Sequence, residues 1–148
     1  MKPPTRLFAG LLLAVLPATG WALDYRSVAA DKTLLYDAPS AQAKKLFIVS
    51  QFMPVEVIVN LGDWVKVRDK RGELAWIESA RLAPLRTVQV TAAQAEVRES
   101  PDPAAAVVFR AEKDVVLELQ EAAPSGWVRV RHRDGLRGYV AAPQVWGL

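Results

Sequence analysis

The stretch that decides the fold is residues 62–68, GDWVKVR, which is followed by Gly72 and by Trp76-Ile77. The same pattern returns 63 residues later as residues 125–131, SGWVRVR, followed by Gly135 and Tyr139-Val140. In both copies the aromatic pair is 12 residues apart, and a glycine lies 8 residues after the tryptophan. Self-similarity at a fixed spacing predicts one structural unit used twice.

The repeat extends upstream of the tryptophans. Residues 35–39 correspond to residues 97–101, and residues 55–57 to residues 117–119, both at an offset of 62, so one residue is added before Trp127. Each unit is predicted as a strand ending in an x-Pro, a loop of about ten residues, an apolar strand, a turn, the tryptophan strand, a glycine hairpin and a closing strand.

The fold class predicted for the rest of the chain is all-β. β-branched residues alternate with polar ones, and no stretch after residue 23 shows helical apolar spacing over three turns. The expected strands cover residues 55–59, 64–68, 74–77, 88–90, 115–119, 127–131 and 139–140. We expect one domain over residues 24–86 and a second over residues 87–148. The junction at residues 81–86 is too short for a flexible linker, so the two units should touch.

The N-terminus predicts a secretory signal peptide over residues 1–22. Lys2 and Arg6 precede an apolar run at residues 7–16, and small residues at Gly20 and Ala22 suit cleavage after Ala22, with a cut after Gly20 as the alternative. A retained membrane anchor is the other interpretation, but ten apolar residues span only about 15 Å of helix against a hydrocarbon core of about 30 Å. We therefore expect a periplasmic or secreted protein without a stable membrane anchor.

Composition narrows the possible functions. Removing residues 1–22 takes away two positive charges and lowers the net charge from +3 to +1, which weakens the case for nucleic acid as a partner. The chain has no cysteine, which excludes thiol catalysis, disulfides and cysteine-ligated zinc. Stability must then come from packing, in units of about 60 residues that are near the lower size limit for an independent core.

The motifs resemble those of the Src-homology-3 (SH3) fold. Gly62-Asp63-Trp64, Gly72 and residues 76–82 look like the distal half of an SH3 barrel, and residues 34–37, LLYD, resemble its opening strand. The whole region over residues 24–148 is similar to exported bacterial SH3-like proteins with two such domains. This resemblance implies two tandem small β-barrels. It says little about the ligand, because members range from wall-targeting modules of hydrolases to stand-alone proteins.

Strand alternation sorts each tryptophan strand into two faces. Val65 and Val67, like Val128 and Val130 in the second copy, should point into the core. Aromatic and cationic residues should share the outer faces, and we take them as the candidate ligand-binding residues: Tyr36, Trp64, Lys66, Arg68 and Trp76 in the first unit, and Trp127, Arg129, Arg131 and Tyr139 in the second.

The resemblance also implies that Trp64 and Trp127 line a peptide groove, joined by Tyr36 in the first unit. The alternative is that these rings only cap the barrels and cover the x-Pro loops at Pro39 and Pro101. A polyproline ligand is disfavoured because Lys44-Lys45 stands where an acidic cluster would be expected. Aromatic and cationic faces suit a partner with carboxylates and sugar or aliphatic surface.

No arrangement of residues predicts catalysis, a cofactor or a metal. His132 is the only histidine, and flanking arginines should favour its neutral form without orienting it. Carboxylates such as Asp69 and Asp134 fall at turns, where local hydrogen bonding is the usual role.

The sequence therefore predicts a non-catalytic envelope binding module for cell-wall peptide or an envelope protein. The alternatives are a structural adaptor that packs on a partner through strand edges and, third, an enzyme. The oligomeric state cannot be predicted.

Overall fold

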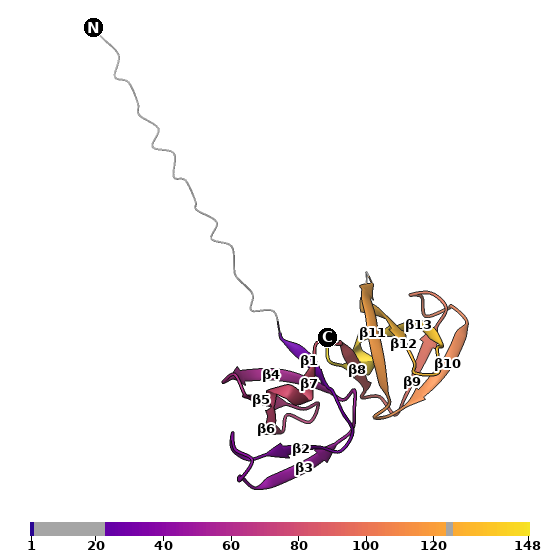
Figure 1. The fold of residues 1–148 in the computed structure, drawn as a ribbon. Helices are drawn as coiled ribbons and strands as arrows, with labels where there is room; N and C mark the ends of the chain where they lie inside the picture. Colours follow the sequence, from indigo (N-terminus) through magenta and orange to yellow (C-terminus); the bar gives the residue numbers. More distant parts are fainter. Residues whose placement is uncertain (2–22, 124–125) are drawn as a thin grey trace.

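The computed structural model describes residues 1, 23–123 and 126–148, and within them the chain is all-β (Figure 1). The predicted signal peptide therefore lies, apart from Met1, outside the described residues. The first unit contains β1 (Tyr25–Val28), β2 (Thr33–Tyr36), β3 (Lys45–Val49), β4 (Pro54–Asn60), β5 (Trp64–Arg68), β6 (Leu74–Glu78), a 3-10 turn η1 (Ser79–Arg81) and β7 (Leu82–Ala83).

The second unit repeats this order. It contains β8 (Thr87–Val90), β9 (Gln94–Arg98), β10 (Val107–Glu112), β11 (Val116–Ala123), β12 (Trp127–Arg131), β13 (Arg137–Ala141), a 3-10 turn η3 (Ala142–Gln144) and β14 (Val145–Trp146). The two predicted tryptophan strands match β5 and β12 residue for residue.

Each unit forms one antiparallel seven-stranded sheet. The strand orders are β3-β2-β6-β5-β4-β1-β7 and β10-β9-β13-β12-β11-β8-β14, so the two sheets have the same topology. The predicted closed barrels are wrong in one respect, because no ladder between described strands joins β3 to β7 or β10 to β14. Both sheets are curled but open, and each keeps two edge strands.

The predicted ten-residue loop after each x-Pro is also wrong. It contains β3 in the first unit and β10 in the second, which pair with β2 and β9. Both pairings include a register shift, between Leu35 and Tyr36 and between Val107 and Phe109. Each pairing joins two consecutive strands through a shifted register, so local alternation gives little sign of it.

The added residue of the second copy falls between Ala123 and Trp127, in a segment that includes residues outside the described part of the chain. Each copy has an irregularity at the same place, after Val57 in β4 and after Leu119 in β11. Beyond it, Leu61 donates to the Trp64 carbonyl at 2.9 Å, whereas Ala123 pairs with Trp127. Leu61 and Trp64 are three residues apart, whereas Ala123 and Trp127 are four residues apart. This extra residue changes the offset between the two copies from 62 to 63.

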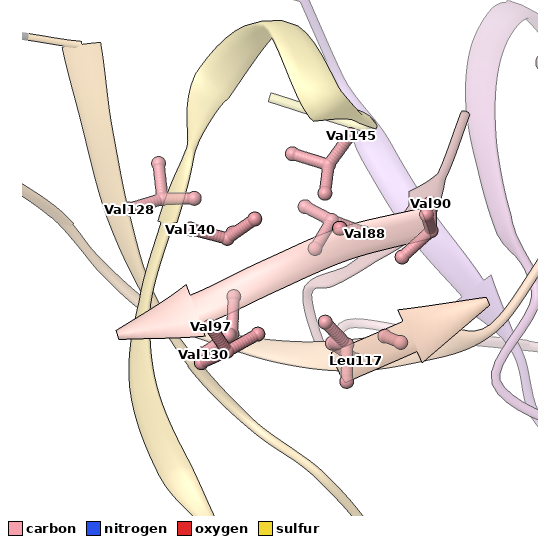
Figure 2. Close-up of a cluster of buried hydrophobic side chains, with 10 residues drawn as sticks. Val88, Val90, Val97, Leu117, Val128, Val130, Val140 and Val145 are labelled. Atoms are coloured by element: carbon pink, nitrogen blue, oxygen red, sulfur yellow. The ribbon is translucent and has the colours of Figure 1, made fainter. Parts of the chain in front are cut away.

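Each unit has its own apolar core. The second one is made mainly of valines from five strands (Figure 2). Both cores contain the inward-facing residues of the tryptophan strands: Val65, Val67, Val128 and Val130 are each 3% exposed or less, which confirms the predicted alternation. Phe47, from the unpredicted β3, packs on the first core.

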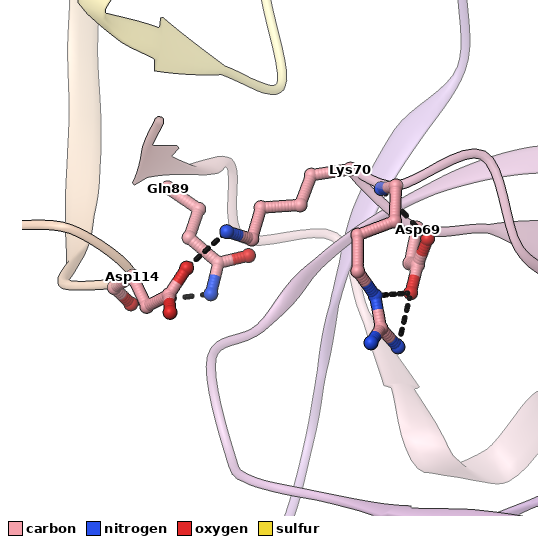
Figure 3. Close-up of polar contacts among 5 residues, drawn as sticks. Asp69, Lys70, Gln89 and Asp114 are labelled. Atoms are coloured by element: carbon pink, nitrogen blue, oxygen red, sulfur yellow. Dashed lines mark hydrogen bonds and ion pairs between the residues drawn. The ribbon is translucent and has the colours of Figure 1, made fainter. Parts of the chain in front are cut away.

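The two units are in contact, as the short junction predicts. Tyr25 of β1 meets Trp146 of β14 edge to face with ring centroids 5.2 Å apart, and the Arg86 guanidinium lies 5.4 Å from the Tyr25 ring. Thr87 Oγ1 donates to the Phe52 carbonyl at 2.6 Å. Lys70 of the first unit forms an ion pair with Asp114 of the second (Figure 3).

Among residues 23–123 and 126–148, the structure contains no helix of the length and apolarity needed to cross a bilayer.

Candidate ligand-binding faces

The first outer face is an aromatic cluster on β2, β5 and β6. The Tyr36 and Trp64 rings meet edge to face, with centroids 5.3 Å apart and planes at 85°. Tyr36 is opposite Trp76 in the β2–β6 pairing, and Lys66 is opposite Trp76 in the β5–β6 pairing. Four of the predicted residues of this unit are thus brought together.

These side chains differ in accessibility. Tyr36 is 6% exposed, so it supports Trp64 from beneath, while Trp64, Lys66 and Trp76 are half-buried and reach the surface. The Lys66 ammonium lies 5.9 Å from the centroid of the Trp76 ring, within the range of a cation–π contact. Lys66 and two indole rings therefore form a platform with both apolar surface and positive charge.

Arg68 takes a different role from the one predicted. Its Nε and Nη2 donate to Glu56 Oε2 at 2.9 and 2.6 Å, and the Glu56 side chain is only 6% exposed. The guanidinium is thereby neutralised by β4. Of the two predicted cations of this face, Lys66 is the one for which no ion pair with a described carboxylate is seen.

The second outer face has fewer aromatic side chains than the first. Tyr139 is opposite both Arg129 on β12 and Arg98 on β9, and Trp127 is opposite Ala141 on β13. Arg98, which stands where the first unit has Tyr36, donates to the Ala105 carbonyl at 2.7 Å and pairs with Glu96. Trp127 therefore has no counterpart of the Tyr36 ring in the second unit.

The remaining cations of the second face have carboxylate partners. Arg129 Nη1 lies 3.5 Å from Glu121 Oε1, and Arg131 Nη2 lies 3.0 Å from Glu118 Oε2. Arg131 and Glu118 repeat the Arg68–Glu56 pair of the first unit. Glu56 and Glu118 are at equivalent positions of the repeat, 62 residues apart, and stand 12 and 13 residues before their arginines.

Pro39 and Pro101 are both exposed. Neither proline is therefore fully covered by a neighbouring ring, and the alternative role of the rings as caps of the two units stays a prediction.

His132 has a partner that the sequence analysis did not predict. Its Nδ1 lies 3.0 Å from Asp134 Oδ2, and its ring packs against Phe109 at 5.7 Å between centroids. The expectation of an unoriented imidazole is wrong, because the tight β12–β13 turn brings the Asp134 carboxylate back to it. Asp134 Oδ1 also accepts the Leu136 N–H at 2.9 Å, and this bond, with a smaller contribution from His132, lowers the pKa of the Asp134 carboxyl.

Turn carboxylates otherwise behave as expected. Asp69 Oδ1 accepts the backbone N–H groups of Arg71 and Glu73 at 2.8 and 3.0 Å. In the part of the chain that the structure describes, no three His, Asp or Glu side chains gather in a way that could hold a metal ion.

A cleft between the two units was not predicted. It has a volume of about 400 Å³. Its walls come from the β3–β4 turn, the junction between the units, the start of β11 and the β12–β13 turn: Ser50, Gln51, Phe52, Leu85, Thr87, Val115, Val116, Glu118, Arg131, His132 and Arg133. It combines an exposed aromatic ring with two guanidinium groups, of which Arg131 is paired with the lining carboxylate Glu118, and its residues come from four separate segments.

Comparison with solved structures finds distant similarity. NlpC2 of Trichomonas vaginalis is 12% identical, with 84% of this chain and 48% of that one covered; NlpC1 of Trichomonas vaginalis is 15% identical, with 92% and 50% covered. An NlpC/P60 family protein of Bacillus cereus ATCC 10987 is 15% identical, with 82% and 55% covered. The TM-score is 0.38 in each case, and this chain spans about half the length of these structures.

No curated protein matches the sequence. A known family does match it, and it matches twice: the bacterial SH3 domain covers residues 29–84 and again residues 91–147, one match on each sheet. The chain therefore belongs to the bacterial SH3 domain family and carries two such domains in tandem.

Proposed function

We propose that this chain is an exported, non-catalytic binding module of the cell envelope, which recognises cell-wall peptide or an envelope protein through its outer faces. The observation that carries the proposal is the platform of the first unit. There Lys66 lies beside Trp76, and Trp64 is held in place by the buried Tyr36 ring. A half-exposed aromatic pair next to one unneutralised cation is the arrangement expected of a binding surface.

The chemistry of the platform selects the class of ligand. Indole faces pack on the C–H surface of sugars and on aliphatic side chains, and the Lys66 ammonium attracts a carboxylate. A wall stem peptide offers these groups together, as does an acidic envelope protein segment. The second unit supplies Trp127 and Tyr139 as a weaker second contact, since Glu121 neutralises Arg129 there.

Sedimentation with purified peptidoglycan sacculi tests the proposal. We expect the protein to sediment with sacculi, and Trp64→Ala to weaken binding by about 2 kcal/mol or more if Trp64 is an anchor. Trp127→Ala should weaken it less, because the second face is less developed. Lys32→Gln removes an exposed cation from the β1–β2 turn that is not among the candidate binding residues, and it should bind as the unmodified protein does.

The stability of each variant is measured in parallel by thermal melting. Because Trp64 and Trp127 are half-buried, their replacement by alanine should cost about 1–2 kcal/mol and leave the protein folded. Retained sacculus binding by both folded variants would remove the two tryptophans as the site.

A structural adaptor remains the second candidate, and the open sheets favour it. β3 is an edge strand, and its Ile48 side chain is 70% exposed. An exposed apolar residue on an unpaired strand edge suits strand addition by a partner protein. Under this alternative the protein does not sediment with sacculi, whereas Ile48→Lys abolishes capture of its partner from envelope extracts.

The non-catalytic part of the proposal is supported by the composition. The chain has no cysteine and therefore no thiol nucleophile, and it has only one histidine. Export is supported by the signal-peptide pattern over residues 1–22. Incubation of the protein with sacculi should release no soluble wall fragments.

A further inference from the structure

Two turns at equivalent positions of the repeat face the interface between the units. Phe52 and Asp114, which are 62 residues apart, both have a left-handed backbone, with φ of 71° and 74°. Their N–H groups donate to the Val28 and Val90 carbonyls at 2.8 and 2.9 Å, so the two turns have the same construction. Aspartate adopts a positive φ at little cost, whereas a bulky phenylalanine does so only with backbone strain. The backbone conformation at position 52 therefore disfavours the phenylalanine that is present there.

Two cations also occupy equivalent positions. Lys70 and Arg133 are 63 residues apart, in the β5–β6 and β12–β13 turns. At one corner of the interface, Lys70 reaches across to Asp114 and forms an ion pair, while Gln89 Nε2 donates to the Asp114 carbonyl at 3.1 Å (Figure 3). Only 15% of the Lys70 side chain is exposed, against 61% of the Asp114 side chain, and we call this ion-paired corner the closed corner.

The other corner of the interface has the equivalent two turns but no counterpart of the Asp114 carboxylate. Phe52 and Arg133 both line the 400 Å³ cleft, and Phe52 occupies the position that Asp114 occupies in the second unit. Among the described residues no carboxylate forms an ion pair with Arg133, whereas Arg131 is paired with Glu118 and His132 with Asp134. The cleft thus contains one guanidinium that forms no ion pair with a described carboxylate, and Arg133 contributes only as the smallest cause of the lowered pKa of the nearby Asp134 carboxyl.

Phe52 is held open to this cleft. Its carbonyl accepts from Thr87 Oγ1 at 2.6 Å and its N–H is bonded to Val28, so the strained turn is held from both units. The side chain remains 43% exposed. A non-glycine residue with positive φ that is fixed in this way is a marker of a functional position.

We propose that the cleft between the two units binds a carboxylate that carries an apolar group, with Arg133 receiving the carboxylate and Phe52 and Val115 contacting the apolar group. The ligand supplies to Arg133 the charge that Asp114 supplies to Lys70 at the closed corner. A volume of about 400 Å³ is within the range of small-ligand sites. Both the terminal carboxylate of a short peptide and a free organic acid meet this description.

This cleft is separate from the Trp64–Trp76 platform and shares only Arg131 with the second outer face. None of its lining residues belongs to the Trp64–Trp76 platform, so its test does not depend on sacculus binding. Failure of one proposal leaves the other standing.

Titration of the ¹⁵N-labelled protein, followed by amide chemical shifts, tests the site. The probes are N-acetyl-alanyl-leucine, the C-terminal amide of the same dipeptide, and isovalerate. We expect the acid dipeptide to shift the amides of residues 50–52 and 131–133, and the amide probe to bind at least about tenfold more weakly, as for loss of a charge-assisted hydrogen bond. Stronger binding of the dipeptide than of isovalerate assigns the site to peptide termini, and the reverse order assigns it to free acids.

Substitutions then separate the two contacts. Arg133→Gln should lose about tenfold in affinity, and Arg133→Lys should retain most of it, because Lys70 performs the same task at the closed corner. Phe52→Asp should abolish binding without lowering the melting temperature, since the new carboxylate suits the turn and pairs with Arg133. Phe52→Asn keeps the turn and removes the ring, so it should weaken binding without abolishing it.

Lys44→Gln removes an exposed cation outside the cleft and should bind all probes as the unmodified protein does. Equal binding of the acid and amide dipeptides would overturn the proposal. So would full affinity in Arg133→Gln or in Phe52→Asp, or shifts confined to residues outside the cleft.

Discussion

Tyr36 and Lys66 lie on the same outer face but contribute to it differently. The Tyr36 ring is 6% exposed and contacts Trp64, whereas the Lys66 ammonium is at the surface over Trp76. Burial of an aromatic side chain makes it part of the fold, while a cation near an exposed ring contributes mainly to ligand contact. Stability and binding should therefore separate at these two positions.

Replacement of Tyr36 by alanine should cost about 3–5 kcal/mol of stability, because it leaves a cavity beneath Trp64. Replacement of Lys66 by glutamine should cost less than about 1 kcal/mol, because an exposed cation–π contact is worth no more than that. Chemical denaturation of both variants measures the difference. Equal losses would mean that Tyr36 is not a structural support for the platform.

At the scale of single residues, the sequence predicted correctly which valines of the tryptophan strands point into the core. It predicted only in part how exposed the side chains of the outer faces are. Alternation was enough to place Val65 and Val67 in the core, because a strand has a period of two. The burial of Tyr36 and the pairing of Arg68 with Glu56 depend on which strands are neighbours. Strand order is set by long-range pairing, which one sequence does not reveal.

At the scale of elements, the repeated β4–β5 and β11–β12 pairs differ in how deeply their carboxylates lie. Glu56 is opposite Arg68, and Glu118 is opposite Arg131, in the same register of the two copies. The Glu56 side chain is 6% exposed and the Glu118 side chain 31%. The two arginines are similarly exposed, at 44% and 41%, so the difference is in the acid.

Arg68→Ala should therefore destabilise the protein by about 3 kcal/mol, because it leaves a buried carboxylate unpaired. Arg131→Ala should cost about 1 kcal/mol or less, since Glu118 can be solvated. Urea denaturation of the two variants provides the comparison, and adding Glu56→Gln to Arg68→Ala should recover part of the loss. Equal effects of the two single substitutions would show that the depth of the acid does not matter.

The edge strands β3 and β10 could not be predicted from the local pattern of apolar and polar residues. β3 has apolar residues at Leu46, Phe47, Ile48 and Val49, without the alternation that marks a half-buried strand. Its role becomes apparent only when β2 pairs with it through a shifted register. Its repeat β10 was missed for the same reason, so one hidden pairing accounts for both errors.

At the scale of the whole molecule, the junction belongs to both units. The Arg86 carbonyl accepts the Leu119 N–H at 3.0 Å in the second unit, while the Arg86 guanidinium lies over Tyr25 of the first and donates to the Gly147 carbonyl at 2.9 Å. Gly147 is itself enclosed, because a Cβ there would lie 2.8 Å from the Thr87 carbonyl oxygen. Contacts on this scale orient the two sheets relative to each other.

Separate fragments of residues 24–86 and 87–148 should each fold, because each has its own core, but with lower melting temperatures than the whole chain. A unit of about 60 residues buries only about 60% of its unfolded surface and is marginally stable. Loss of the Tyr25–Trp146 contact removes further apolar burial. Dispersed amide spectra for both fragments, with reduced melting temperatures, are the expected result. If neither fragment folds alone, the two domains form one cooperative folding unit.

Tyr25 makes this interface sensitive to alkaline pH. It is 8% exposed between Trp146 and Arg86, and burial, with a further contribution from the Glu56 carboxylate, raises the pKa of its hydroxyl above the ordinary value of 10.0. The folded protein thus holds the proton more tightly than the unfolded chain does. This contribution to stability is complete below the unfolded pKa and is lost as pH rises through the folded one. Tyr25→Phe keeps the ring without the hydroxyl, so its melting temperature should fall less than that of the unmodified protein above about pH 10. Melting curves recorded from neutral to strongly alkaline pH decide this, and a constant difference between the two proteins would rule Tyr25 out as the titrating group.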